Sequence, residues 1–292
     1  MPPSLPDALL KVSRPGVRLC VRRFGGAPDP PLILLHGFPD FWRGWAGLIG
    51  ALAGEGQTLL VPDLRGYGDS EAGPGAAFDL GALADDVLAI ADASGAQTFD
   101  LAGSDWGGVI AWACAQIAPR RVRRLMALNA PHPFVFAQTL QTDPDQQARS
   151  AYIAALQSPG AEASVAADEF AALEAAFASV VAAGRRDAAI QQAYREAWAR
   201  PQRLEAMLAY YRSATFLQDC GSTWRPHAPL QSPTLLIWGE QDGAFVPTLP
   251  DAHRPIAARL TIRREPALGH WPHQEDPARI AALWRAWAAV ID

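Results

Sequence analysis

The residues best suited to chemistry lie in one short turn, residues 103–108, which read Gly-Ser-Asp-Trp-Gly-Gly. The turn stands between an apolar run and an apolar helical pattern, and it has the form of a nucleophile elbow. Such elbows often present serine, but this one presents Asp105. A carboxylate that attacks carbon becomes part of an ester, so the turn predicts opening or displacement at an alkyl carbon rather than acyl transfer.

The simpler interpretation of Asp105 is a helix N-cap. Gly103, Gly107 and Gly108 favour the elbow, because a tight strand-to-helix turn needs positive or crowded backbone angles and close backbone approach. The helix N-terminus that follows is expected to keep the Asp105 carboxylate ionised. Ser104 lies one residue from the tip and is assigned no catalytic role.

A second motif, residues 36–39 (His-Gly-Phe-Pro), directly follows the apolar run 32–35. In proteins with a nucleophile elbow, a loop at this place supplies one backbone N–H of an oxyanion hole, and the residue after the nucleophile supplies the other. We therefore expect Phe38 and Trp106 to be the two donors. His36 is interpreted as a structural hydrogen-bonding residue rather than as a base.

A general base should lie in the loop after the last strand, where residues 268–272 read Leu-Gly-His-Trp-Pro. The glycine lets the loop project the ring of His270 inward, so His270 is the predicted base. His273 is the rival, but it begins the approach to the terminal helix and is expected to be solvated.

The acid that orients this base has two usual positions, each after a strand. After the run 125–128 stands Asn-Ala-Pro, which has no acid, whereas residues 238–243 read Trp-Gly-Glu-Gln-Asp-Gly. Asp242 is therefore predicted, with Glu240 as the alternative. Asp63 is interpreted as a structural acid that holds the Arg-Gly-Tyr-Gly turn after it.

Seven short apolar runs must position these loops, and each is bounded by glycine, proline or polar residues. They are residues 17–21, 32–35, 59–61, 99–102, 125–128, 235–238 and 260–262. Several are apolar on both faces, which suits parallel strands covered by helices on each side. Helical periodicity at 80–91 and 109–117 lies between them. This alternation predicts an α/β fold with a mostly parallel wound sheet.

The last helix is expected to begin at Pro277, with Asp276 as its cap. One face of it would carry Ile280, Leu283, Trp287 and Val290.

The alternation stops between about residues 130 and 229, where the sequence is alanine-rich and helical. Apolar side chains recur there at spacings of three and four, at Phe170, Leu173, Phe177 and Val180 and at Leu204, Met207, Leu208 and Tyr211. This periodicity predicts an inserted helical lid at residues 131–228, on a core formed by residues 1–130 and 229–292.

Composition narrows the class of protein. The 292 residues are 50% hydrophobic and 19% charged, which suits a large globular domain, and the net charge of −5 offers no basic field for nucleic acid. No stretch of 18 apolar residues and no signal-like N-terminus is present, so we expect no membrane partner and a cytoplasmic location. Cys20, Cys114 and Cys220 have no metal-like spacing and are expected to be buried in a reducing compartment.

The chain resembles the epoxide hydrolases of the α/β-hydrolase fold over nearly its whole length. The resemblance rests on the elbow and on residues 36–39, 63–70 (Asp-Leu-Arg-Gly-Tyr-Gly-Asp-Ser), 238–242 and 269–271. Haloalkane dehalogenases of the same branch share these motifs, so the motifs alone leave the reaction open.

Two lid tyrosines hydrogen-bond and protonate the epoxide oxygen in that family. The resemblance places one at Tyr152, seven residues before the proline of residues 157–160 (Gln-Ser-Pro-Gly), and the other at Tyr211, just before Arg212. Periodicity agrees, because Tyr211 shares the apolar stripe of its helix whereas Tyr210 is turned away by about 100°. Both tyrosines could also be ordinary buried aromatic residues.

The rival families differ at defined positions. Haloalkane dehalogenases usually carry asparagine where this chain has Phe38, and fluoroacetate dehalogenases carry arginines just after the nucleophile, where this chain has Trp106 and residues 109–111. The resemblance therefore implies an epoxide hydrolase that forms a vicinal diol. A dehalogenase using the same aspartyl ester, and a binding protein that has lost catalysis, are the alternatives.

The expected mechanism begins with attack of Asp105 on the epoxide while Tyr152 and Tyr211 donate to its oxygen. His270, oriented by Asp242, then activates water to hydrolyse the ester. Substrate contacts are expected from Phe38, Pro39, Trp106 and Phe134. The expected partners are a small lipophilic epoxide and water. This mechanism requires no metal or organic cofactor, and the histidine spacings offer no zinc motif. The oligomeric state, monomer or homodimer, is left open.

Overall fold

The computed structural model describes residues 5–26, 30–53 and 57–291. Within them, nine strands form one sheet in the order β1-β2-β4-β3-β6-β7-β8-β9, with β5 paired to β2. The strands are β1 (Ala8–Arg14), β2 (Val17–Phe24), β3 (Leu32–Leu35), β4 (Leu59–Pro62), β5 (Glu71–Ala72), β6 (Phe99–Ser104), β7 (Val122–Leu128), β8 (Thr234–Gly239) and β9 (Leu260–Glu265). The neighbouring strands β4, β3, β6, β7, β8 and β9 pair parallel. The pairs of β2 with β1, β4 and β5 are antiparallel.

Each of the seven predicted apolar runs lies within one of these strands, which confirms the mostly parallel wound sheet. Strands β1 and β5 were not predicted. Most residues of β1 are exposed, because it is an edge strand that pairs only with β2, so it lacks the continuous apolar run of a buried strand.

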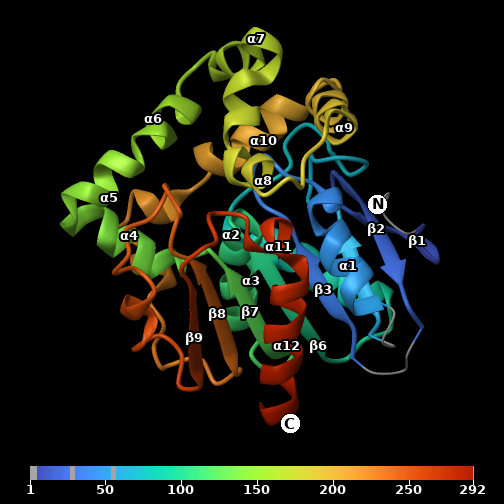
Figure 1. Cartoon of the computed structure of the whole chain (residues 1–292), viewed down its shortest axis with the longest axis vertical. Helices are drawn as coiled ribbons and strands as arrows, with labels where there is room; N and C mark the ends of the chain where they lie inside the picture. The colour runs from blue at the N-terminus through green and yellow to red at the C-terminus, as the bar shows by residue number, and fades with distance from the viewer. Residues whose placement is uncertain (1–4, 27–29, 54–56, 292) are drawn as a thin grey trace.

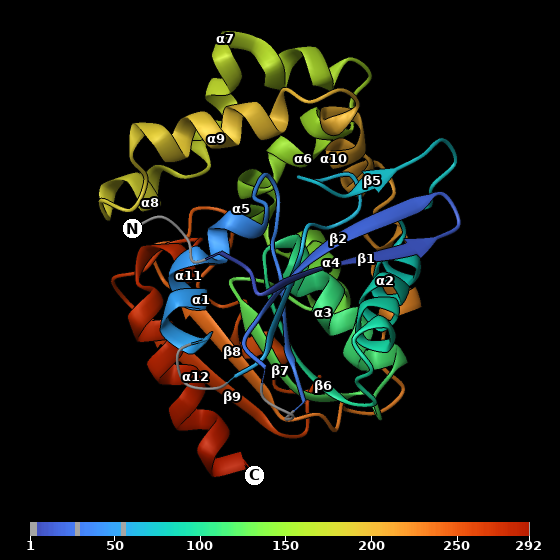
Figure 2. The same ribbon diagram turned by 90° about the vertical axis from the view of Figure 1, so that its right-hand side faces the viewer.

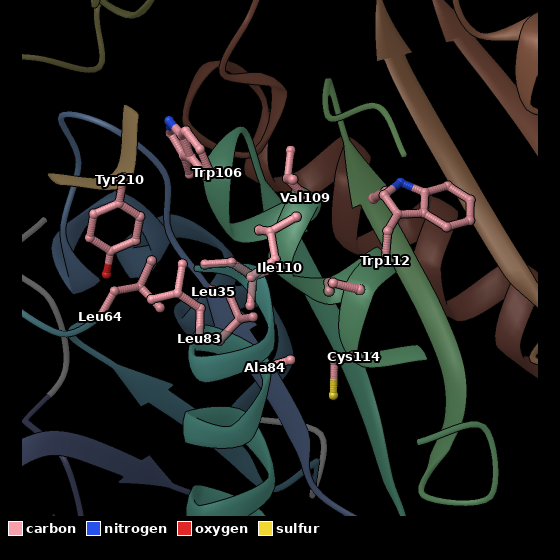
Figure 3. Packing of buried hydrophobic residues seen from close by; sticks show 14 of the residues in the cluster. Leu35, Leu64, Leu83, Ala84, Trp106, Val109, Ile110, Trp112, Cys114 and Tyr210 are labelled. Atoms are coloured by element: carbon pink, nitrogen blue, oxygen red, sulfur yellow. The ribbon is translucent and has the colours of Figure 1, made fainter. Parts of the chain in front are cut away.

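Helices cover both faces of the sheet. Helices α1 (Ala46–Leu52) and α12 (Pro277–Ile291) lie on one face, and α2 (Leu80–Ala93) and α3 (Trp106–Ile117) lie on the other (Figure 1, Figure 2). The side chains of β3 alternate between these layers, because successive strand residues point to opposite faces. Leu32 and Leu34 pack in the cluster with α1 and α12, whereas Leu35 packs with Leu83 and Ile110 of α2 and α3 (Figure 3).

Helix α12 begins at Pro277 as predicted, and Asp276 Oδ1 accepts the Arg279 N–H at 3.0 Å. Its predicted apolar face is wrong in part. The buried residues are Ile280, Ala281, Trp284 and Trp287, while Val290 is 83% exposed. Leu283 is partly buried and packs against the same core cluster, whereas the end of the helix, with Val290, extends past the sheet (Figure 1).

The chain between β7 and β8 is helical and contains no strand, and all of it is described. We call residues 133–224 the helical segment. It comprises α4 (Pro133–Thr142), α5 (Pro144–Arg149), α6 (Ala151–Gln157), α7 (Ala161–Ala175), α8 (Ala178–Ala182), α9 (Ala188–Trp198), α10 (Arg203–Arg212) and the short 3₁₀ turns η3 (Thr215–Leu217) and η4 (Ser222–Trp224). Helices α6 to α10 lie together across one end of the sheet (Figure 1, Figure 2).

Three further expectations can be compared with the described residues. None of their helices is long and apolar enough to cross a membrane, and they hold no cluster of three or more candidate metal ligands. All three cysteines are free, but only Cys114 is buried. The expectation of burial is wrong for Cys20, on an edge-side strand, and for Cys220, in a surface turn, since both are partly exposed.

Candidate active site

The elbow is a sharp turn from β6 into α3. Asp105 stands between the two elements with φ 52° and ψ −126°, a conformation that side-chain-bearing residues rarely adopt and that costs about 1–3 kcal/mol. The prediction that the glycines bear the unusual backbone angles of this turn is wrong for φ. Positive φ falls on Asp105, while Gly103, Gly107 and Gly108 are absent from the positive-φ residues of the described chain.

The three glycines are required by close approach instead. A Cβ on Gly107 would lie 2.1 Å from the Leu35 carbonyl oxygen, and one on Gly108 would lie 2.1 Å from the Ala130 Cβ. A Cβ on Gly103 would lie 2.2 Å from the Gly107 carbonyl oxygen. Helix α3 therefore packs directly on the strand ends, and this packing lifts Asp105 above the sheet edge.

The Asp105 side chain does not cap α3, although the residue occupies the N-cap position. Its Oδ1 accepts a hydrogen bond from the Phe38 N–H at 2.7 Å, and its Oδ2 lies 3.4 Å from His270 Nε2. The first predicted oxyanion donor is thus in direct contact with the predicted nucleophile. The second, Trp106, is the first residue of α3, where backbone N–H groups have no partner within the helix.

His270 joins the two predicted carboxylates. Its Nδ1 lies 2.8 Å from Asp242 Oδ2, on the side of the ring opposite to Asp105. Burial would lower the pKa of His270, but the carboxylates of Asp242 and Asp105 outweigh it and raise the pKa to about 10. At neutral pH the free protein therefore carries an imidazolium between two carboxylates.

Asp242 is the acid that the structure brings to His270, with a fully buried side chain. Its Oδ1 also accepts the Ala244 N–H at 2.7 Å. The alternative acid, Glu240, pairs with Arg264 at 3.2 Å and is a third exposed, so it has no part in the cluster.

Beside Asp105 lies a cavity with about 410 Å³ of empty space, counted out to its mouth. Its polar lining residues are Asp105, Tyr152 and Tyr211, and the rest of its wall is apolar or aromatic: Trp106, Val109, Pro131, Phe136, Ile153, Phe216, Leu217 and Phe245. The structure thus brings both predicted lid tyrosines and the predicted nucleophile to the same space.

The two tyrosine rings lie edge to face in the lining of this cavity, with ring centroids 6.2 Å apart and planes nearly perpendicular. Tyr211 is buried, whereas Tyr152 is 41% exposed. Desolvation of each hydroxyl, together with the negative charge of Asp105, raises the pKa of both phenols. Both are therefore neutral O–H donors at physiological pH.

Comparison with known proteins identifies the family of the chain. The model of the "alpha/beta hydrolase fold" family matches residues 30–277. The chain belongs to the α/β-hydrolase fold family.

Similar proteins include one with a general name and several named as epoxide hydrolases. This α/β hydrolase is 31% identical to the AB hydrolase superfamily protein YfhM of Bacillus subtilis, over 93% of this chain and 94% of that protein. It is 30% identical to epoxide hydrolase 4 of Mus musculus, over 96% of this chain and 78% of that protein. The crystal structure of a Bacillus megaterium epoxide hydrolase in complex with an inhibitor matches with a TM-score of 0.87 at 27% identity, covering 96% of this chain and 100% of that one.

Sequence reasoning missed a residue that holds the acid of this α/β hydrolase. Asn129 donates from Nδ2 to Asp242 Oδ2 at 2.7 Å and to the Gly239 carbonyl at 3.0 Å, and its Oδ1 accepts the Gly239 N–H at 2.8 Å. It is fully buried at φ 41°. The signal in the sequence is a polar residue directly after a buried strand, at one of the two usual positions of the orienting acid.

Gln157 was also missed. It belongs to the Gln-Ser-Pro-Gly motif that located Tyr152, and its Nε2 donates to the Tyr211 carbonyl at 2.8 Å. The motif thus joins the ends of α6 and α10, which carry the two tyrosines. Tyr210 points away from the cavity and donates to the Arg65 carbonyl at 2.9 Å, beside Leu64 (Figure 3).

The solvated position predicted for His273 is wrong. The ring is fully buried in α11 (Pro272–Glu275), 4.1 Å from the Trp45 ring between centroids, because α11 packs against α1 and the loop before it. His36 has the predicted structural role, since its Nε2 accepts the Leu64 N–H at 2.9 Å. Asp63 also has the predicted structural role. Its Oδ2 accepts the Asp69 N–H at 2.9 Å and holds the turn between the two residues.

Of the four predicted substrate contacts, only Trp106 lines the cavity. Phe136 lines the cavity in place of Phe134, because residues two apart on helix α4 point about 160° apart. The Pro39 carbonyl instead accepts the indole N–H of Trp198 at 2.7 Å. Phe38 packs its ring edge-on against Tyr211 at 5.1 Å and contributes its N–H to Asp105.

Proposed function

We propose that this chain hydrolyses epoxides to vicinal diols through a covalent ester on Asp105. One observation carries the proposal: Asp105, Tyr152 and Tyr211 line a single cavity whose other walls are apolar. A strained ether opens readily when a carboxylate attacks carbon while O–H donors neutralise the oxygen that leaves. The relatives named as epoxide hydrolases support the same reaction.

In the first step, Asp105 Oδ2 attacks an epoxide carbon and the bond from that carbon to the ring oxygen breaks. The oxygen takes a proton from Tyr152 or Tyr211, which leaves a tyrosinate and a hydroxyalkyl ester. Oδ2 is the attacking atom because Oδ1 is held by the Phe38 N–H. The ester removes the charge of Asp105, one of the two carboxylates that raise the pKa of His270. The pKa therefore falls, and the ring can give up its proton to the tyrosinate.

In the second step, neutral His270 takes a proton from water as the water attacks the ester carbonyl. Phe38 and Trp106 N–H groups stabilise the oxyanion, a contribution of about 10²–10³ in rate for one such donor. Collapse of the intermediate expels the diol oxygen, which takes the proton held by His270. The water's second proton, now on the regenerated Asp105 carboxyl group, passes to the His270 ring. The free enzyme is then restored with one epoxide and one water consumed.

We also propose that residues 131–228 form a cap on a core of residues 1–130 and 229–292. The helical segment supplies both tyrosines and the core supplies Asp105, His270 and Asp242. The apolar walls, including Phe136, favour a lipophilic epoxide without charged groups, because nothing there would replace the hydration of a charge.

Diol formation from a panel of aryl and alkyl epoxides tests the proposal, with Asp105→Ala as the blank. We expect turnover by the wild type and none by the variant, and a mass shift on the Asp105 peptide after rapid quenching. Halide release from bromoalkanes without diol formation from any epoxide would replace this function by dehalogenation. Bound epoxide without an adduct or a diol would overturn the covalent scheme.

A further inference from the structure

A second carboxylate, Glu275, is bound to the loop that carries His270. Its Oε2 accepts the Gly269 N–H at 2.6 Å, and its Oε1 accepts the Trp271 N–H at 3.1 Å. The two donors are the residues immediately before and after His270, and Glu275 is itself buried. One side chain therefore fixes the backbone on both sides of the predicted base.

The helical segment supplies the third donor to this carboxylate. Ser179 of α8 donates from Oγ to Glu275 Oε1 at 2.6 Å. Contact at this place is close, since a Cβ on Gly269 would lie 3.1 Å from both the Ser179 Cβ and Glu275 Oε1. The side chain of Glu275 thus lies between the His270 loop and α8, which stands directly above α11 in Figure 1.

Trp271 makes a parallel connection. Its indole N–H donates to the Ala176 carbonyl at 2.7 Å, and its ring stacks on Phe177 with centroids 5.0 Å apart. Residues 176–179 therefore contact the His270 loop directly through a backbone carbonyl and an aromatic ring, and indirectly through the Ser179 hydroxyl on Glu275. Trp271 is thus bound both by Glu275, through its backbone N–H, and by the helical segment, through its indole N–H.

We propose that Glu275 is a positioning residue for the ester-hydrolysis step, and that Ser179 couples it to the helical segment. A carboxylate has only acceptors, and here it meets three donors that converge on its two oxygens. A glutamine would present one oxygen and one NH₂ group, so one backbone N–H beside His270 would face another donor. The loop would then shift, and with it the Nδ1 contact to Asp242 and the Nε2 position over Asp105.

This inference rests on the proposed function, because there His270 acts as a base only in the second step. The first step uses Asp105, Tyr152 and Tyr211, none of which bonds to Glu275. Loss of the carboxylate should therefore slow hydrolysis of the ester more than its formation. A merely structural glutamate would slow both steps together.

The test is Glu275→Gln in the full chain, followed by stopped-flow and rapid-quench kinetics with an epoxide that the wild type turns over. We expect ester formation to change by less than about threefold and ester hydrolysis to fall by about 10- to 100-fold, the effect of a displacement of about 1 Å. The ester should then accumulate on the Asp105 peptide. Equal loss in both steps, or unchanged hydrolysis, would overturn the proposal.

Glu240→Gln is the matched control, because it makes the same chemical change at an exposed ion pair in the neighbouring loop. Both of its rates should equal those of the wild type. Ser179→Ala keeps the carboxylate and removes one hydrogen bond worth about 1 kcal/mol, so hydrolysis should fall by about fivefold even if Glu275→Gln fails to fold. An unchanged Ser179→Ala hydrolysis rate would remove the coupling to the helical segment.

Histidine NMR separates failure of this inference from failure of the proposed function. In the free protein, the His270 ring should titrate near pH 10 in the wild type and at lower pH in Glu275→Gln, since the ring moves away from Asp242. That comparison needs no substrate. An identical titration in both proteins would overturn the positioning role, whereas absence of epoxide turnover by the wild type would overturn only the proposed function.

Discussion

The elbow and the helical segment place their polar groups by different means. At the elbow, backbone geometry decides: Asp105 has φ 52°, and Gly107 lies so close to β3 that no side chain fits. In the helical segment, Tyr152 and Tyr211 extend from short helices whose ends are joined by side-chain hydrogen bonds from Gln157 and Arg212. The contrast teaches that changes at the elbow should damage the fold, while changes at the tyrosines should damage only the chemistry.

The largest effect is expected for His270→Gln, which removes the base but leaves the elbow intact. The Asp105 ester should form and then persist, so steady-state diol formation should fall by about 10³- to 10⁴-fold. Intact-mass spectrometry after epoxide addition checks this through the accumulated adduct. An adduct that disappears at the wild-type rate would show that the base lies elsewhere.

The paired change Tyr152→Phe with Tyr211→Phe should come next, lowering the rate of ester formation by about 10²- to 10⁴-fold. The Tm should change little, because neither hydroxyl supports the core. Tyr210→Phe is the matched control: it loses a buried hydrogen bond worth about 1 kcal/mol and should retain epoxide turnover. Full activity in the double variant would break the assignment of chemistry to the helical segment.

Gly107→Ala tests the elbow side of the comparison. The added Cβ would lie 2.1 Å from the Leu35 carbonyl, so the free energy of unfolding should fall by about 1–3 kcal/mol in urea titration. Gly50→Ala adds the same methyl group to α1, where nothing lies within 4 Å, and should instead stabilise by up to about 1 kcal/mol. Equal stability of the two variants would contradict the role of close approach.

The last prediction concerns the pH dependence of stability. The pKa of His270 is raised from its ordinary 6.5 to about 10, so protonation favours the folded state. This contribution is complete below pH 6.5 and is lost as the pH rises through about 10. The Tm advantage of the wild type over His270→Gln, about 2–4 °C for each 1 kcal/mol, should therefore shrink between pH 6.5 and 10 in thermal scans. A growing difference would reverse the assigned sign.

The sequence predicted well those features of the fold and site that depend on a short local pattern of residues. Buried parallel strands are continuous apolar runs, and the elbow and its partner loops are short motifs at the ends of those runs. The edge strand β1 was not predicted, because its residues are mostly exposed and form no continuous apolar run. The glycine spacing predicted the turn correctly, but only coordinates show that Asp105 rather than a glycine bears the positive φ.

The parts that sequence could not predict depend on contacts between distant segments. His273 is buried by α1 and the loop before it, which no pattern near residue 273 records. Asn129 acts through Asp242, 113 positions later in the chain. Phe134 and Phe136 are equally apolar, and only the rotation of α4 decides which one lines the cavity.

The hydrogen bond from the Phe38 N–H to Asp105 makes the two oxygens of that carboxylate unequal. Under the proposed mechanism, Oδ1 becomes the ester carbonyl and then the oxyanion, while Oδ2 leaves in the diol and solvent replaces it. The first turnover in H₂¹⁸O should therefore release unlabelled diol, and every later turnover should release labelled diol. Asp105 should take up one heavy oxygen and never a second, so one atom of the nucleophile is renewed in each cycle and the other is permanent.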